Sequence, residues 1–250
     1  MAALANFAFG PVKANEIASD GPPVVVDQAG PGIFPPGWLA ARIDAKAEPL
    51  AEADRERARR IMTSALKKYP ASVLAANLKT VYVVGRLEYG GVATGGTNSR
   101  SVVYVAGRGD YSAADVERIF HAEFSSILLR NFRRDFAEEA WRKINPSEFR
   151  YLGSGVQAVR AGQASDRPRA ALYEAGFLTQ YAQASMEEDF NSIASRLIMG
   201  DETLYAAVAR HPKLRAKAEL VIEFYGRLDP SFTRDRFHAL RAADENESGF

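Results

Sequence analysis

The stretch FHAEFSSILLRN, residues 120–131, carries the residue types best suited to chemistry in this chain. Helices that bind zinc often have the pattern H-E-x-x-H, in which two imidazoles one turn apart hold the metal and the Glu acts on bound water. The corresponding residues here are Ala122, Glu123 and Ser126. The carboxylate is therefore present, whereas both histidines of the pattern are absent.

Helical periodicity predicts where Glu123 points. At about 100° per residue, the predicted helix buries one apolar stripe, made of Val116, Ile119, Phe120, Phe124, Ile127 and Leu128. Glu123 lies one turn from two members of this stripe, and the small residues Ala122 and Ser126 leave space on the same flank. Burial raises the pKa of a carboxyl group and favours a role as general base or acid. The alternative is a structural carboxylate paired with Arg130 or with a tyrosine hydroxyl.

The three histidines give little support for a metal site. His121 is about 200° from Glu123 around a helix, so the two cannot close on one ion. Its neighbours Glu117 and Ser125 predict an ion pair on an outer face of the helix. His211 and His238 are isolated and are expected at the surface. With no cysteine, a zinc site would depend on carboxylates, which suit harder ions better.

A second acidic cluster lies at Glu187, Glu188 and Asp189. Ser185 and Glu188 have the spacing of a capping box, which predicts that Glu188 serves the beginning of a helix. Glu187 falls on the apolar side of that helix. We expect it to meet Glu123 across a cleft, as a carboxylate pair for acid–base chemistry or as part of a metal site.

Composition excludes several classes of function. The 250 residues are 47% hydrophobic and 25% charged, which is typical of a globular protein. The net charge of +1 gives no electrostatic reason to expect binding to nucleic acid or to an anionic membrane. The apolar runs are far shorter than the roughly 20 residues of a membrane span. The absence of cysteine excludes disulfides and thiolate chemistry.

Residue patterns predict an α+β protein, with a small sheet in the N-terminal half and a mostly helical C-terminal half. Expected strands cover residues 24–26, 80–87 and 101–106, and a glycine-rich hairpin connection is expected between the last two. Expected helices cover residues 51–69, 112–131, 134–144, 185–200, 213–228 and 231–242.

Two segments are expected along the chain. Residues 1–35 form an irregular leader and N-terminal segment, and residues 36–245 form a single domain. The leader has no basic region ahead of its short apolar stretch, so it does not match an intact signal peptide. The compartment stays open, with a secreted or periplasmic location among the alternatives.

Several motifs together resemble a family of bacterial proteins assigned as zinc-binding metallopeptidases of the zincin class. They are the run from Tyr104 to Asn131, GGTNS at 95–99, WRKINPSEFRY at 141–151 and EEDFN at 187–191. The similarity covers roughly residues 34–197. Members of the family carry H-H-E-F-S-S where this chain has residues 121–126 as H-A-E-F-S-S.

This resemblance implies a zincin-like fold, with an active-site helix packed on a small sheet and a Glu from a later helix. By this resemblance Glu123 is the catalytic Glu, Glu187 is the later acid and zinc is the cofactor. Two departures weaken the metal site. Ser126 replaces the second zinc-binding His, a trait shared with the family, and Ala122 replaces the first.

The function expected from these observations is that of a pseudoenzyme, in which a zincin-like site has lost its metal and binds a peptide or protein. Two alternatives stay open. One is an active metal-dependent hydrolase with Glu123 as general base, and the other is a structural or interaction module without an active site. The sequence does not define the oligomeric state.

Overall fold

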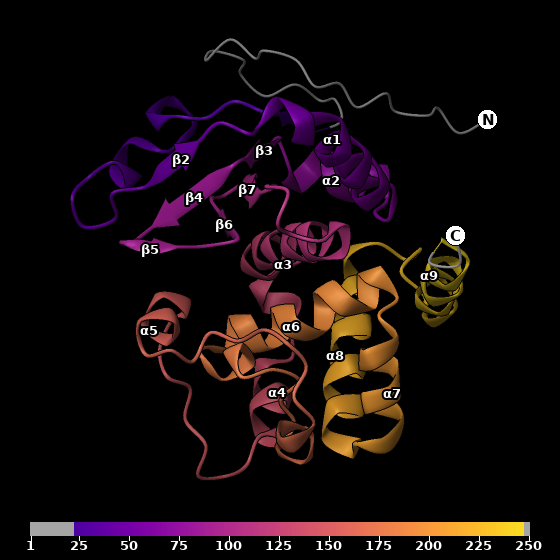
Figure 1. Cartoon of the computed structure of the whole chain (residues 1–250). Coiled ribbons are helices and arrows are strands. Elements are labelled where there is room, and N and C mark those ends of the chain that lie inside the picture. Colours follow the sequence, from indigo (N-terminus) through magenta and orange to yellow (C-terminus); the bar gives the residue numbers. More distant parts are fainter. Residues whose placement is uncertain (1–22, 248–250) are drawn as a thin grey trace. The chain divides into compact units, whose positions relative to one another are not determined.

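The structure is a computed structural model that describes residues 23–247 (Figure 1). The chain divides into two compact units, residues 1–127 and 128–250, and each is described by itself. Helix α3 (Ala113–Asn131) begins in the first unit and ends in the second. The predicted leader and N-terminal segment covers residues 1–35, of which residues 1–22 lie outside the described residues. The prediction of a single domain over 36–245 stays a prediction.

The first unit contains a four-stranded sheet in the order β1-β3-β7-β6. Its strands are β1 (Val24–Val26), β3 (Thr80–Val84), β7 (Val102–Ala106) and β6 (Gly96–Asn98). The first three strands run parallel, and β6 runs antiparallel to β7 at the edge of the sheet. The central strands are rich in buried valine, as expected for parallel strands covered on both faces.

A second, three-stranded sheet contains β2 (Lys46–Glu48), β4 (Arg86–Tyr89) and β5 (Val92–Ala93). The strand predicted over residues 80–87 is broken at Gly85, where a Cβ atom would lie 2.4 Å from the carbonyl oxygen of Pro49. The chain therefore bends there and leaves the first sheet as β4.

The predicted hairpin between residues 80–87 and 101–106 is wrong, because β3 and β7 pair in parallel. The glycine-rich connection instead contains strands of its own. It turns back at Gly90 and Gly91, whose φ angles of 63° and 74° suit a tight hairpin turn, to form the antiparallel pair β4–β5. It then returns as β6 beside β7. The sequence pattern indicated a glycine-rich connection but neither its turn at Gly90 and Gly91 nor the strands within it.

Three helices belong wholly or partly to the first unit: α1 (Glu52–Lys67), α2 (Ala71–Asn77) and the first part of α3. The predicted helix over 51–69 is confirmed as α1. Tyr69 lies between α1 and α2 and packs its ring against Phe120 and Phe124 of α3. The predicted cap of α3 is confirmed, since the backbone N–H of Asp115 donates to Oγ of Ser112 at 3.0 Å.

The second unit is mostly helical, as predicted. Its helices are α4 (Glu138–Ile144), α5 (Gly155–Arg160), α6 (Met186–Met199), α7 (Glu202–Arg210), α8 (Pro212–Leu228) and α9 (Arg234–Glu247). Helix α6 is almost wholly buried and contacts α7, α8 and α9. Ser185 caps its first turn, and Gly200 ends it with a left-handed φ of 80°. The short helix α7, capped by Asp201, was not predicted.

These elements confirm the α+β class with small sheets. Within residues 23–247 every helix is too short or too polar to cross a membrane.

Candidate functional site

Glu123 lies on the side of α3 that faces the edge strand β6. The side-chain amide of Asn98 donates a 2.7 Å hydrogen bond to Oε2 of Glu123. Gly96 lies so close that an added Cβ would be 2.9 Å from Oε1 of Glu123 and 2.6 Å from Cγ2 of Ile119. The half-buried carboxylate is thus held against β6, and glycine at position 96 makes room for it.

Hydrogen-bond alternation defines which backbone groups of β6 point away from β7. The N–H of Ala106 donates to the carbonyl of Gly95, and the N–H of Ser99 donates to the carbonyl of Val102. In an antiparallel ladder these bonded pairs alternate with pairs whose backbone groups point outward. Residue 97 therefore bonds to β7, and the N–H and C=O of Gly96 point to the outer edge. The Gly96 carbonyl there accepts from the hydroxyl of Thr94 at 2.8 Å.

The positions that would hold zinc in the H-E-x-x-H pattern do not fit the metal. Ala122 offers no donor atom, and Ser126 offers a buried hydroxyl in place of an imidazole. Within the described residues, no three side chains of His, Asp or Glu gather in a group able to hold a metal ion. The zinc implied by the family resemblance therefore has no matching set of ligands in this part of the chain.

His121 is completely buried, so its predicted place on an outer face is wrong. The predicted contact with Glu117 is confirmed, with Nε2 3.1 Å from Oε1. The Nδ1 atom lies 2.9 Å from the hydroxyl of Tyr69. Glu117 also forms a 2.7 Å ion pair with Lys68. The segment that follows α1 covers this side of α3, and Tyr69 from that segment and Glu117 from α3 itself occupy the two ring nitrogens.

The charges around His121 follow from this burial. Burial lowers the pKa of His121 below 6.5, although Glu117 acts in the opposite direction. Burial alone would raise the pKa of Glu117, but its hydrogen bond with His121 and the charge of Lys68 outweigh that effect and hold it well below 4.5. At neutral pH a neutral imidazole therefore donates from Nε2 to a charged carboxylate and accepts at Nδ1 from Tyr69.

Glu187 lies in the first turn of α6 and is more exposed than the position on the apolar side of the helix that was predicted for it. Its side chain is 42% exposed, and Oε1 lies 3.8 Å from the guanidinium of Arg130. Arg130 was the partner considered for Glu123, yet it lies beside Glu187. Glu123 and Glu187 belong to different units of the chain, so their predicted meeting across a cleft stays a prediction.

Glu188 has the capping position that the sequence predicted. Its backbone N–H donates to Oγ of Ser185 at 3.1 Å, and its carboxylate accepts from the hydroxyl of Tyr181 at 3.0 Å. The remaining histidines lie outside both carboxylate clusters. His211 contacts Glu174, and His238 is exposed, as predicted.

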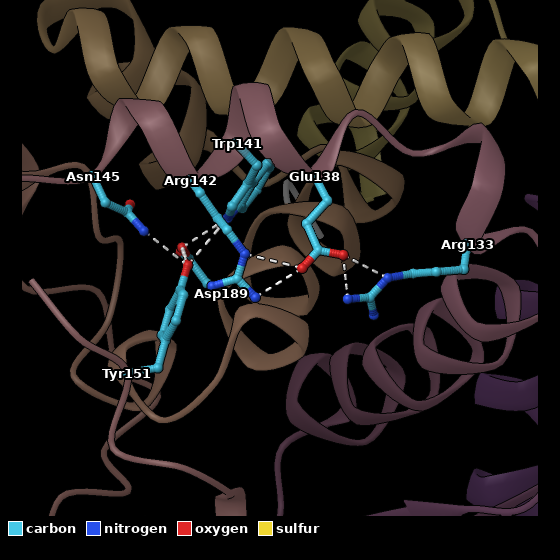
Figure 2. A network of polar contacts seen from close by, with 7 residues as sticks. All are labelled: Arg133, Glu138, Trp141, Arg142, Asn145, Tyr151 and Asp189. Carbon is cyan, nitrogen blue, oxygen red and sulfur yellow. Dashed lines mark hydrogen bonds and ion pairs between the residues drawn. The ribbon is translucent and has the colours of Figure 1, made fainter.

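Sequence reasoning placed Asp189 in the second acidic cluster but gave it no role, and the structure shows it completely buried in the second unit. Figure 2 shows its carboxylate beside Trp141 and Tyr151. Oδ2 accepts from Nζ of Lys217 at 2.6 Å, from the hydroxyl of Tyr151 at 2.7 Å and from Nε1 of Trp141 at 3.0 Å. The sequence signal was a lysine at position 217 between Leu214 and Val221, on the buried face of α8.

The polar network drawn in Figure 2 extends from Asp189 to Arg133, Glu138 and Arg142 at the surface. Figure 2 shows Glu138 between two guanidinium groups, with Arg142 on one side and Arg133 on the other. Burial would raise the pKa of Glu138, but the hydrogen bonds from both arginines lower it. Exposed ion pairs of this kind add little stability, whereas removal of one partner from the buried pair at Asp189 is costly.

Comparison with family models, with curated proteins and with solved structures gives no significant match for this chain.

Proposed function

We propose that this chain is a zincin-like peptidase relative that binds an extended peptide along β6 and does not cleave it. The single observation that carries the proposal is the position of Glu123 beside an edge strand. The carboxylate lies on the face of β6 that Gly96 and Asn98 share, at the end of a sheet.

An edge strand can bind a peptide by adding it as a further strand. Main-chain hydrogen bonds then supply affinity, and pockets for alternate side chains supply specificity. The outward backbone groups of Gly96 are suited to the first role. A peptide residue aligned with Gly96 would direct its side chain toward the face of the sheet that carries Glu123, since side chains alternate between faces.

The absence of cleavage rests on the chemistry of the residues at the metal positions. A zincin needs imidazoles at the positions of Ala122 and Ser126, and His121 lies on another side of α3 with both nitrogens engaged. A half-buried Glu beside an edge strand, without imidazoles at positions 122 and 126, is suited to recognition. The active hydrolase has no specific observation in its favour within residues 23–247.

Selection from a random-peptide library displayed on phage tests this proposal. Retained peptides are synthesised, and their affinity for the chain is measured by fluorescence anisotropy. Gly96→Val is expected to weaken binding at least tenfold, because the added side chain would push into Ile119 and Glu123.

The matched control is Gly32→Ala, where an added Cβ meets nothing within 4 Å. It is expected to bind like the unchanged chain. The proposal fails if no peptide is retained, if Gly96→Val binds normally, or if the peptides are cleaved during incubation.

A further inference from the structure

Lys217 and Asp189 form an ion pair that is fully buried beside aromatic rings. Both side chains are fully buried, and Nζ lies 2.6 Å from Oδ2. The ammonium group lies over the ring of Phe177, 4.2 Å from its centroid, and 5.1 Å from that of Trp141. Amine and carboxyl are thus held together in an apolar enclosure that excludes water.

The two oxygens of Asp189 have different surroundings. Oδ2 accepts from Trp141 and Tyr151 as well as from Lys217. Oδ1 is buried and has no hydrogen-bond partner among the described residues. One oxygen is therefore surrounded by donors that stabilise negative charge, as in an oxyanion hole, while the other is buried without a donor, which favours its protonated form.

Burial also shifts both groups toward their neutral forms. It raises the pKa of Asp189 above 3.8 and lowers the pKa of Lys217 below 10.5, although the opposite charge of each partner acts against the shift. A neutral amine is a nucleophile, and a neutral carboxylic acid is an electrophile, whereas the ion pair is neither. The backbone carbonyl of Gly176 accepts from Nζ at 2.7 Å and fixes the direction of the amine.

We propose that Lys217 and Asp189 condense to an intramolecular isopeptide bond that joins α8 to α6. One proton passes from the ammonium group to Oδ2, the oxygen that Nζ contacts, and the carboxyl group then carries it on Oδ1. Nζ then attacks Cγ to form the N–C bond, and negative charge develops on Oδ2 beside Trp141 and Tyr151. A second proton passes from nitrogen to Oδ1, the Cγ–Oδ1 bond breaks and one water molecule leaves. The three ammonium protons end as one amide N–H and two protons of water.

The product is a covalent link between two helices in a chain without cysteine, which has no disulfide available for this purpose. The reaction needs no co-reactant or metal. Water exclusion by the aromatic side chains favours condensation over hydrolysis. The link concerns the second unit alone and is independent of peptide binding at β6.

Mass spectrometry of the denatured full chain tests the proposal. The intact mass is expected to be lower than the sequence mass of 27.4 kDa by one water molecule. Trypsin normally cleaves after Lys217, but an amide on Nζ blocks this cleavage. The expected digest therefore contains a branched peptide in which residues 170–196 are joined to residues 216–227.

Two variants locate the reaction. Lys217→Arg keeps the positive charge but is expected to have its full sequence mass. Tyr151→Phe removes one donor to Oδ2 and is expected to give a mixture of linked and unlinked chains. A full sequence mass for the unchanged chain overturns the proposal. So does a loss of water that maps to residues other than Asp189 and Lys217, or that persists in Lys217→Arg.

Discussion

The side-chain amide of Asn98 donates a 2.7 Å hydrogen bond to the carboxylate of Glu123 and so connects the edge strand β6 to α3. The first atom of a side chain at position 96 would collide with the same carboxylate. The residues of β6 at positions 96 and 98 therefore both contact Glu123, the Glu of the sequence motif on α3.

Substitution of Asn98 tests how much this contact between β6 and α3 contributes to stability. Asn98→Ala removes a hydrogen bond to a charged group and is expected to lower the free energy of unfolding by about 1.5–3 kcal/mol. Asn98→Asp has the same shape but places a second carboxylate against Glu123, so a larger loss is expected at pH 7 than at pH 4. Urea denaturation at both pH values provides the measurement. Unchanged stability of Asn98→Asp at pH 7 would contradict the contact.

The buried His121 predicts a loss of stability in mild acid. Its folded-state pKa is lowered below 6.5, so unfolding takes up a proton, and stability falls as the pH decreases from 6.5 toward the folded-state value. A tenfold difference in proton affinity between the folded and the unfolded chain corresponds to about 1.4 kcal/mol. His121→Asn lacks the titrating imidazole and is expected to show a flatter dependence between pH 7 and 5. Parallel curves for the two chains would refute this assignment.

Glu117 adds a second decrease in folding stability at lower pH. Its pKa is held below 4.5 in the folded chain, so the stability it contributes is present above pH 4.5 and is lost as the pH falls further. Glu117→Gln is expected to remove this second decrease, measured by thermal unfolding between pH 5 and 3. A decrease of equal size in the variant would show that other carboxylates cause it.

How far the sequence predicts the fold depends on the range of the interactions involved. The helices at 51–69, 112–131 and 185–200 were predicted from periodicity and caps, which act within a few residues. The pairing of β3 with β7 was not, because a parallel pair is defined by contacts between distant segments. Gly85 shows the same limit, since its role depends on the carbonyl of Pro49.

In the candidate site, too, features that depend on local interactions were predicted and features that depend on distant segments were not. Periodicity placed Glu123 on the inward side of α3, and the partner Asn98 came from a strand that was not predicted. His121 was misplaced because the periodicity of one helix does not reveal a second buried side, here covered by Tyr69. Asp189 was overlooked because a buried charge is recognised only through its partners, and Lys217 lies 28 residues away.

The pair of Asp189 and Lys217 predicts a non-additive effect of substitution. Lys217→Met cannot form the link and leaves a carboxylate buried with neutral donors only, so it is expected to cost at least about 3–5 kcal/mol. Asp189→Asn together with Lys217→Met removes both charges, so the double variant is expected to be more stable than Lys217→Met alone. Chemical denaturation of the variants measures the coupling. A double variant no more stable than Lys217→Met would mean that the unpaired buried carboxylate does not cause the loss.

The metal positions on α3 predict a gain of function. Ala122→His combined with Ser126→His completes the H-E-x-x-H pattern with two imidazole ligands and is expected to take up added zinc, measured by isothermal titration calorimetry. The unchanged chain and the single variant Ala122→His are expected to hold no stoichiometric zinc. One equivalent in the unchanged chain would favour the active hydrolase.

The most direct test of peptide binding at β6 is the hydrogen-exchange rate of the Gly96 amide, followed by NMR with and without a saturating library-selected peptide. Strand addition would bond this outward N–H, so its exchange is expected to slow at least tenfold. The Thr97 amide, directed toward β7, is expected to change far less. A bound peptide that leaves the exchange of Gly96 unchanged would contradict the proposed function.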